Sequence, residues 1–110
     1  MVIYGGFRTV WVFVLFDLPT ETKKQRREYA IFRKKIMSDG FTMQQYSVYI
    51  RHCASDQNAA VHIERVKTVL PPEGEVRVLV ITDNQFGRMK VFYGKKRKAV
   101  ETPPAQLEFF

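Results

Sequence analysis

Cysteine, histidine and long apolar runs are scarce in this sequence of 110 residues. The single cysteine, Cys53, cannot form an internal disulfide, which favours a reducing, cytoplasmic compartment. The two histidines provide no zinc cluster, because neither a Cys-x-x-Cys nor a His-x-x-x-His spacing occurs. No apolar run approaches the roughly 18 residues of a membrane span, and residues 1–8 lack the apolar core of a secretory signal. We therefore expect a cytoplasmic protein without a zinc cluster or a membrane partner.

Acidic residues are also outnumbered. Eighteen Lys and Arg stand against eleven Asp and Glu, which gives a formal net charge of +7 and a pI near 9.8. This balance favours a polyanionic partner, most simply nucleic acid, although a basic surface can also serve solubility alone. The length is typical of one domain, and 45% hydrophobic residues suffice for a core. We expect a folded domain over residues 1–94 and a basic tail with a short strand over residues 95–110.

The segment Thr9–Phe16 consists of β-favouring residues without a charge and predicts a buried strand. One face of this strand would carry Val10, Val12, Val14 and Phe16, and the other Trp11, Phe13, Leu15 and Asp17. Both faces are apolar, so both have to be covered. Pro19 keeps the preceding residue out of the helical region, so the strand ends near Asp17. A carboxylate in this position is suited to chemistry, but it is equally an ordinary turn residue.

The next segment, Thr20–Asp39, predicts a helix. Thr22 and Gln25 have the spacing of a capping box. The residues predicted to face the core are Tyr29, Ala30, Phe32, Ile36 and Met37. Arg26 and Arg33 fall inside this apolar arc, and we expect their long side chains to reach outward at its edge.

Three further strands and a second helix are predicted. The strands are Phe41–Arg51, Glu75–Thr82 and a weaker one at Arg88–Tyr93, with a turn over residues 83–85. The helix follows Ser55 and runs to about Leu70, with an apolar stripe formed by Ala59, Ile63, Val66 and Leu70. His62, on the same helix, is expected at the surface. We interpret the chain as an α+β ferredoxin-like β-α-β-β-α-β sandwich, with an antiparallel sheet and two helices on one face.

This plan leaves the second face of the sheet bare. A large apolar face usually has a partner, and a second copy of the chain is the simplest one. We therefore expect a homodimer that packs sheet against sheet. The terminal segment Gln106–Phe110 could add a strand to an edge of either subunit. Its apolar residues Leu107, Phe109 and Phe110 are our candidates for partner binding.

Several motifs in this frame resemble one known family. They are Phe16-Asp17-Leu18-Pro19-Thr20, Tyr29-x-x-Phe32-Arg33-Lys34, Ser38-Asp39-Gly40-Phe41, Gln45-Tyr46-Ser47-Val48-Tyr49 and Gln85-Phe86-Gly87-Arg88-Met89. In this order, over roughly residues 10–93, they resemble the CRISPR-associated Cas-two family, the non-integrase subunit of the spacer-acquisition complex. The form is most similar to those of type II systems, which also carry a Cas-nine effector.

The resemblance implies a ferredoxin-like homodimer with two roles. One role is a scaffold that bridges two integrase dimers and holds incoming double-stranded DNA, which is the general role in the family. The other is a magnesium-dependent nuclease, acting on RNA or double-stranded DNA, that uses the aspartate at the end of the first strand. In the family this activity occurs in some members and is dispensable for spacer acquisition. A ferredoxin-like RNA-binding module is a third hypothesis, but residues 76–80 lack the aromatic and glycine pattern of its base platform.

Asp17 is the candidate catalytic residue and metal ligand. One carboxylate is few for Mg²⁺, but a two-fold axis would place Asp17 of both subunits across a cleft, where a shared cation relieves their repulsion. Asp83 is a weaker second candidate. The alternative is structural, with Asp17 accepting backbone N–H groups of its own turn.

The candidate nucleic-acid-binding residues are Lys23, Lys24, Arg26, Arg27, Arg77 and Arg88. The first four belong to the opening turns of the first helix, where helix amides already favour phosphate. The run Lys95–Lys98 is a further candidate. A solvated helix face is the alternative interpretation of such a charge run.

Overall fold

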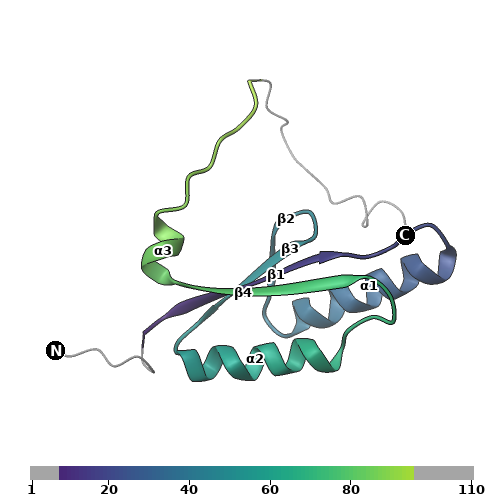
Figure 1. Cartoon of the computed structure of the whole chain (residues 1–110), viewed down its shortest axis with the longest axis horizontal. Helices are drawn as coiled ribbons and strands as arrows, with labels where there is room; N and C mark the ends of the chain where they lie inside the picture. The colour runs from purple at the N-terminus through teal and green to yellow at the C-terminus, as the bar shows by residue number, and fades with distance from the viewer. Residues whose placement is uncertain (1–7, 96–110) are drawn as a thin grey trace.

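The computed structural model describes residues 8–95 and contains a four-stranded antiparallel sheet (Figure 1). In chain order the elements are β1 (Val10–Asp17), α1 (Lys23–Ser38), β2 (Thr42–Gln45), β3 (Val48–Cys53), α2 (Asp56–Thr68), β4 (Glu75–Thr82) and α3 (Asp83–Gly87). The strand order is β2-β3-β1-β4, and α1 and α2 lie on the same face of the sheet. The predicted ferredoxin-like α+β fold is therefore confirmed. Within residues 8–95, no helix has the length and apolar character to cross a bilayer.

The sheet is built around β1, which pairs with β3 on one side and β4 on the other. Its residues Val10, Val12 and Val14 are fully buried beneath the helices. A strand with two neighbours and a covered face needs apolar, β-branched side chains, which are what this segment provides.

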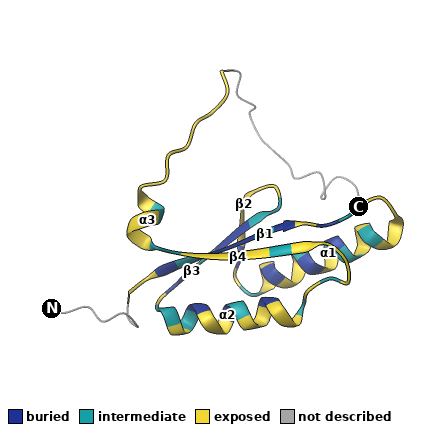
Figure 2. Ribbon diagram, in the orientation of Figure 1, coloured by how far each residue is buried: buried dark blue, intermediate teal, exposed yellow. Residues whose placement is uncertain are grey.

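The hydrophobic core lies between the helix layer and the sheet (Figure 2). Tyr29, Phe32 and Ile36 enter it from α1, as predicted. The Phe16 ring meets the Phe32 ring edge-on at a centroid distance of 5.1 Å. Met37, predicted in the same face, is exposed instead, because Ile36 takes the inward position and the next residue is rotated by about 100°.

α1 begins at Lys23, later than predicted, and its capping box is confirmed. Thr22 Oγ1 accepts a hydrogen bond from Gln25 N–H, and Gln25 Oε1 accepts one from Thr22 N–H, each at 3.0 Å. In α2, Ala59 and Val66 are buried and Ile63 is half-buried, but the predicted core residue Leu70 is exposed beyond the helix end.

The predicted strand Phe41–Arg51 is wrong in its extent, because the segment forms a hairpin of β2 and β3. The turn between them contains Tyr46 and Ser47, and Ser47 has a left-handed backbone with a φ of 64°. Its carbonyl accepts the Phe16 N–H at 3.1 Å. The turn carries no glycine, proline, aspartate or asparagine, and serine is only a weak turn former, so the local sequence signals no clear break.

The predicted strand Arg88–Tyr93 is also wrong in the described chain. Residues 83–87 form the short helix α3, with Thr82 and Gln85 as a second capping box, and residues 88–95 lead away from it without regular structure. The fourth strand of the fold is thus Glu75–Thr82. The tail strand, with Leu107, Phe109 and Phe110, lies outside the described residues.

The face of the sheet opposite the helices is here called the open face. Among the described residues, α3 covers one end of it. There Phe86 of α3 stacks on Trp11 with ring centroids 4.0 Å apart, and Trp11 Nε1 donates a 2.7 Å hydrogen bond to Asp83 Oδ1. Leu79, farther along the face, is 51% exposed. Phe13, on the same face, is only 9% exposed, so the bare apolar face expected from the sequence is present only in part, at Leu79.

A partly buried network of hydrogen bonds joins the end of α1 to the second half of α2. His62 is only 5% exposed, contrary to the predicted surface position, and its Nδ1 lies 2.8 Å from Asp39 Oδ2. Arg65 Nη1 donates to Asp39 Oδ1, also at 2.8 Å. Burial acts to raise the pKa of Asp39, but the hydrogen bonds and charges of His62 and Arg65 outweigh it and lower that pKa.

We expect Asp39→Asn to lower the free energy of unfolding at neutral pH by on the order of 1–2 kcal/mol, because the ionised partner of two hydrogen bonds is lost. A lowered folded-state pKa stabilises the fold above the unfolded value, about pH 4, and this contribution disappears as the pH falls through the lower folded value. Urea unfolding at several pH values should therefore show the deficit shrinking in acid. Glu64→Gln, at an exposed ion pair with Lys67, is the control and should change stability by less than about 0.5 kcal/mol. An equal deficit at every pH would contradict the assignment.

Candidate metal centre and nucleic-acid interface

Asp17 is the last residue of β1 and is exposed at the end of the open face away from α3. Its strand parity places it beside Leu15 on that face, as predicted. The carboxylate accepts no hydrogen bond from any residue between 8 and 95, so the turn alternative has no bond to support it in the described chain. An exposed carboxylate with unused oxygens is suited to a cation or a water.

The backbone around Asp17 is closely packed although its side chain is not. Gly74 has a φ of +101°, and a Cβ there would lie 2.8 Å from the Asp17 carbonyl oxygen and 2.6 Å from a methyl of Leu18. Only glycine allows the loop before β4 to approach this closely. Leu18 is buried, which anchors the chain just after the carboxylate. The end of β1 is thereby held in place while the acid stays accessible.

The antiparallel register brings a second carboxylate, Glu75, directly opposite Asp17. Arg77, opposite Leu15, binds Glu75 through its Nε and Nη2 at 3.3 and 3.2 Å. Sequence reasoning missed Glu75, because about half of the chain separates it from Asp17 and only the β1–β4 pairing joins them. Arg77, a candidate from sequence, does lie at this end of the face, in an exposed ion pair that costs little to open.

These residues fit a magnesium ion only as part of its ligand set. Among residues 8–95, no three His, Cys, Asp or Glu side chains gather closely enough to hold a metal. Mg²⁺ is commonly held by one or two carboxylates together with waters and substrate phosphates. Asp17, with Glu75 across the strand, could supply the carboxylates, and the remaining ligands would have to come from a second subunit or from nucleic acid.

Asp83 does not belong to this site. It follows β4 at the end that pairs with Val10, roughly 20 Å along β1 from Asp17. Its carboxylate is engaged by Trp11 and lies 3.8 Å from His52. Arg88, the residue after α3, is exposed at this same far end and is not brought near Asp17.

The predicted basic residues of α1 do gather. The helix has seven Lys and Arg but only one acidic residue, Glu28. Lys23, Lys24 and Arg27 are exposed at its start and form no ion pair with a described residue. Arg26 is different, because its Nη1 donates to the carbonyl oxygens of Thr20 and Glu21 at 3.1 and 3.0 Å. It secures the loop into α1, which explains its position in the apolar arc. Of the run Lys95–Lys98, only Lys95 lies within the described residues.

The molecule is thus a ferredoxin-like domain whose helix layer includes a strongly basic helix. Its sequence matches the family described as CRISPR associated protein Cas2 over residues 10–89. The chain therefore belongs to the Cas2, or Cas-two, family, as its motifs indicated.

Two relatives illustrate the match. A protein of Parvibaculum lavamentivorans is 59% identical over 101 residues, which is 92% of this chain and 100% of that protein. A protein of Flavobacterium psychrophilum is 52% identical over 104 residues, which is 94% of this chain and 90% of that protein. Both are named CRISPR-associated endoribonuclease Cas2. A solved structure titled as a crystal structure of cas2 has a TM-score of 0.57 at 15% identity, covering 86% of this chain and 97% of its own, and supports the fold.

Proposed function

We propose that this protein is the homodimeric DNA-binding scaffold of CRISPR spacer acquisition and that it holds double-stranded DNA for the integrase subunit. The observation that carries the proposal is the start of α1, where Lys23, Lys24 and Arg27 are exposed without acidic partners among the described residues. Such cations bind phosphates through charge and without reading bases. This suits a protein that has to accept DNA of any foreign sequence.

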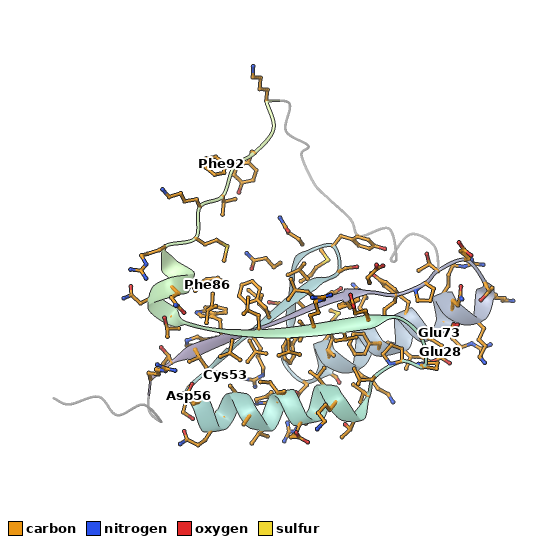
Figure 3. The ribbon with its side chains drawn as sticks, viewed as in Figure 1. Glu28, Cys53, Asp56, Glu73, Phe86 and Phe92 are labelled. Carbon is orange, nitrogen blue, oxygen red and sulfur yellow. The ribbon has the colours of Figure 1, made fainter. Side chains whose placement is uncertain are left out.

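Two features support a homodimer. The open face beyond α3 exposes Leu79, and the outer edge of β4 pairs with no described strand. Residues 88–95 carry Phe92, 85% exposed, on a segment that leads away from α3 (Figure 3). This segment has a strand-like pattern but forms no strand among the described residues, and a partner's β4 edge could pair with it. With the open faces packed together, α1 of each subunit faces outward.

We expect light scattering to give the mass of a dimer at micromolar concentration. Leu79→Glu should shift the mass toward the monomer, because it places a charge in the contact between the two sheets. Val61→Glu is the control, since Val61 is 47% exposed on α2, outside the open face. A monomeric wild-type protein, or a dimer that both variants leave intact, would contradict this interface.

Replacing cations of α1 should lower the affinity for a DNA duplex, and it should make that affinity less dependent on salt concentration. For Lys23→Gln/Arg27→Gln the slope of log K against log salt should fall by up to about two, one for each phosphate that is no longer neutralised. The control Lys67→Gln/Lys90→Gln removes the same charge from other exposed positions. Fluorescence anisotropy across a salt series measures both variants. Equal slopes for the two would remove α1 from the DNA-binding surface.

A magnesium-dependent endonuclease that uses Asp17 is the second candidate. It is favoured by the exposed Asp17–Glu75 pairing and by the name endoribonuclease carried by both relatives. A magnesium ion held there would activate water for attack on a phosphodiester. Asp17 would hold it, and Arg77 could turn from Glu75 toward a phosphate. The described residues offer no histidine beside Asp17 as a general base, so a low turnover is expected.

If this second activity is present, chelation and Asp17→Asn should both abolish cleavage of RNA or duplex DNA. The same substitution should change the free energy of unfolding by less than about 0.5 kcal/mol, because the side chain is exposed and has no hydrogen-bond donor among residues 8–95. An integration assay with the cognate integrase separates the two functions. Integration that persists with Asp17→Asn supports the scaffold, whereas cleavage that persists with it excludes Asp17 as the catalytic residue.

A further inference from the structure

An exposed aromatic ring stands at the edge of the helix layer. Tyr46, in the turn between β2 and β3, is 48% exposed. One side of its ring stacks on Tyr29 of α1, with centroids 6.2 Å apart and planes 21° from parallel. Tyr29 is buried, and its hydroxyl lies 3.2 Å from Ser47 Oγ. Tyr46 is therefore held by a fixed ring on one side, and about half of its surface is open to solvent.

A guanidinium group is fixed on the same helix as Tyr29, the residue on which Tyr46 stacks. Arg33 follows Tyr29 by one turn of α1, and its Nε donates a 2.6 Å hydrogen bond to Tyr49 Oη. The guanidinium carbon lies 6.0 Å from the centre of the Tyr49 ring. Burial raises the pKa of Tyr49, although Arg33 acts in the opposite direction, so this hydroxyl stays neutral and accepts the bond. The uncharged Tyr49 hydroxyl thus orients Arg33 without neutralising the positive charge of the guanidinium.

The outer nitrogens of Arg33 are available to a ligand. Its Nη1 and Nη2 form no hydrogen bond with a described residue. Every fully buried side-chain nitrogen among the described residues has a hydrogen-bond partner, so these two nitrogens are not fully buried and have contact with solvent. A guanidinium held through Nε presents its remaining N–H groups as a rigid fork that matches a phosphate. Arg26 falls on the same arc of α1, but backbone carbonyls occupy it, which sets Arg33 apart.

The turn that carries Tyr46 is strained in a way that orients the ring. Ser47 adopts a φ of 64°, and it is held there by Tyr29 on its hydroxyl and by Phe16 N–H on its carbonyl. A residue with a side chain in this region costs free energy, and such strain is concentrated where a group has to be positioned. The Tyr46 ring stacks on α1, on the helix side of the sheet, so a dimer that packs through the open face leaves it accessible.

We propose that Tyr46 and Arg33 form a docking site for one unpaired nucleotide, with the base stacked on Tyr46 and a neighbouring phosphate bound by Arg33. Stacking on an aromatic ring needs an exposed base face, which the interior of a duplex does not offer. The occupant is therefore single-stranded nucleic acid, either RNA or a splayed end of DNA that lies along α1. The proposal rests on the proposed function, because it assumes that nucleic acid binds along α1. It adds a separate site for an unpaired base, which duplex binding does not require.

The test uses the full-length protein with a short single strand that contains 2-aminopurine, and with a duplex of the same length. Stacking quenches the fluorescence of this base, so wild type and Tyr46→Phe should quench it on binding. Tyr46→Leu should abolish the quenching and weaken single-strand binding on the order of tenfold, with duplex binding unchanged. Arg33→Gln should reduce the salt slope for the single strand by about 0.7, while Arg33→Lys should retain the slope and lose affinity. Thermal melting checks that each variant is folded.

The outcomes separate this proposal from the scaffold. Tyr46→Leu that binds and quenches like wild type overturns the docking site, and so does a wild type that binds only duplex. In both cases duplex binding still supports the scaffold. A wild type that binds single strands through Tyr46 but not duplex supports the docking site and overturns the scaffold. If Tyr46→Leu instead leaves all nucleic-acid binding intact and loses the integrase in a pull-down, the surface binds protein and the proposal is wrong.

Discussion

The burial of β1 between β3, β4 and the helix layer is the interaction on which the rest of the structure depends. Val10, Val12 and Val14 are inaccessible to solvent, and the aromatic rings of α1 pack against Phe16, the next residue on the same face. Such close packing leaves β1 no freedom to slip, because a shift of one residue would exchange its two faces. The same register places Asp17 at the end of the sheet, Glu75 opposite it and Arg77 two pairs farther in.

The fixed sheet separates the molecule into two surfaces of different character. The helix side carries the exposed cations of α1 and, at its edge, the Tyr46 ring and the Arg33 guanidinium. The open face is apolar in its middle, where Phe13 and Ile50 are buried and Leu79 is exposed, and it carries charged residues at the Asp17 end. Apolar surface favours contact with another protein, whereas cations beside exposed aromatic rings favour nucleic acid. One small domain could therefore pair with its twin through one face and bind DNA with the other.

Polar residues inside or beside the core have structural explanations that differ from one another. Arg26 closes the loop before α1 through backbone carbonyls, and His62 joins Asp39 at the far end of the helix layer. Arg33, in contrast, is held by a neutral hydroxyl and keeps donors for a ligand. A buried or half-buried charge is thus informative about function only after its partners are known.

Local chemistry along the chain was enough to predict the first strand, both long helices, the capping box at Thr22 and the exposed acid at Asp17, because periodicity and capping depend on residues close in sequence. The family motifs were equally local. The hairpin turn at Ser47 was missed because an ordinary residue takes a backbone that tertiary hydrogen bonds impose. The strand expected at Arg88–Tyr93 does not form within the described residues, since strand formation depends on pairing as well as on pattern. Likewise the pairing of Asp17 with Glu75, the burial of His62 and the placing of Arg33 beside Tyr49 join residues distant in sequence. Folding alone decides such contacts, because they depend on strand register and helix packing.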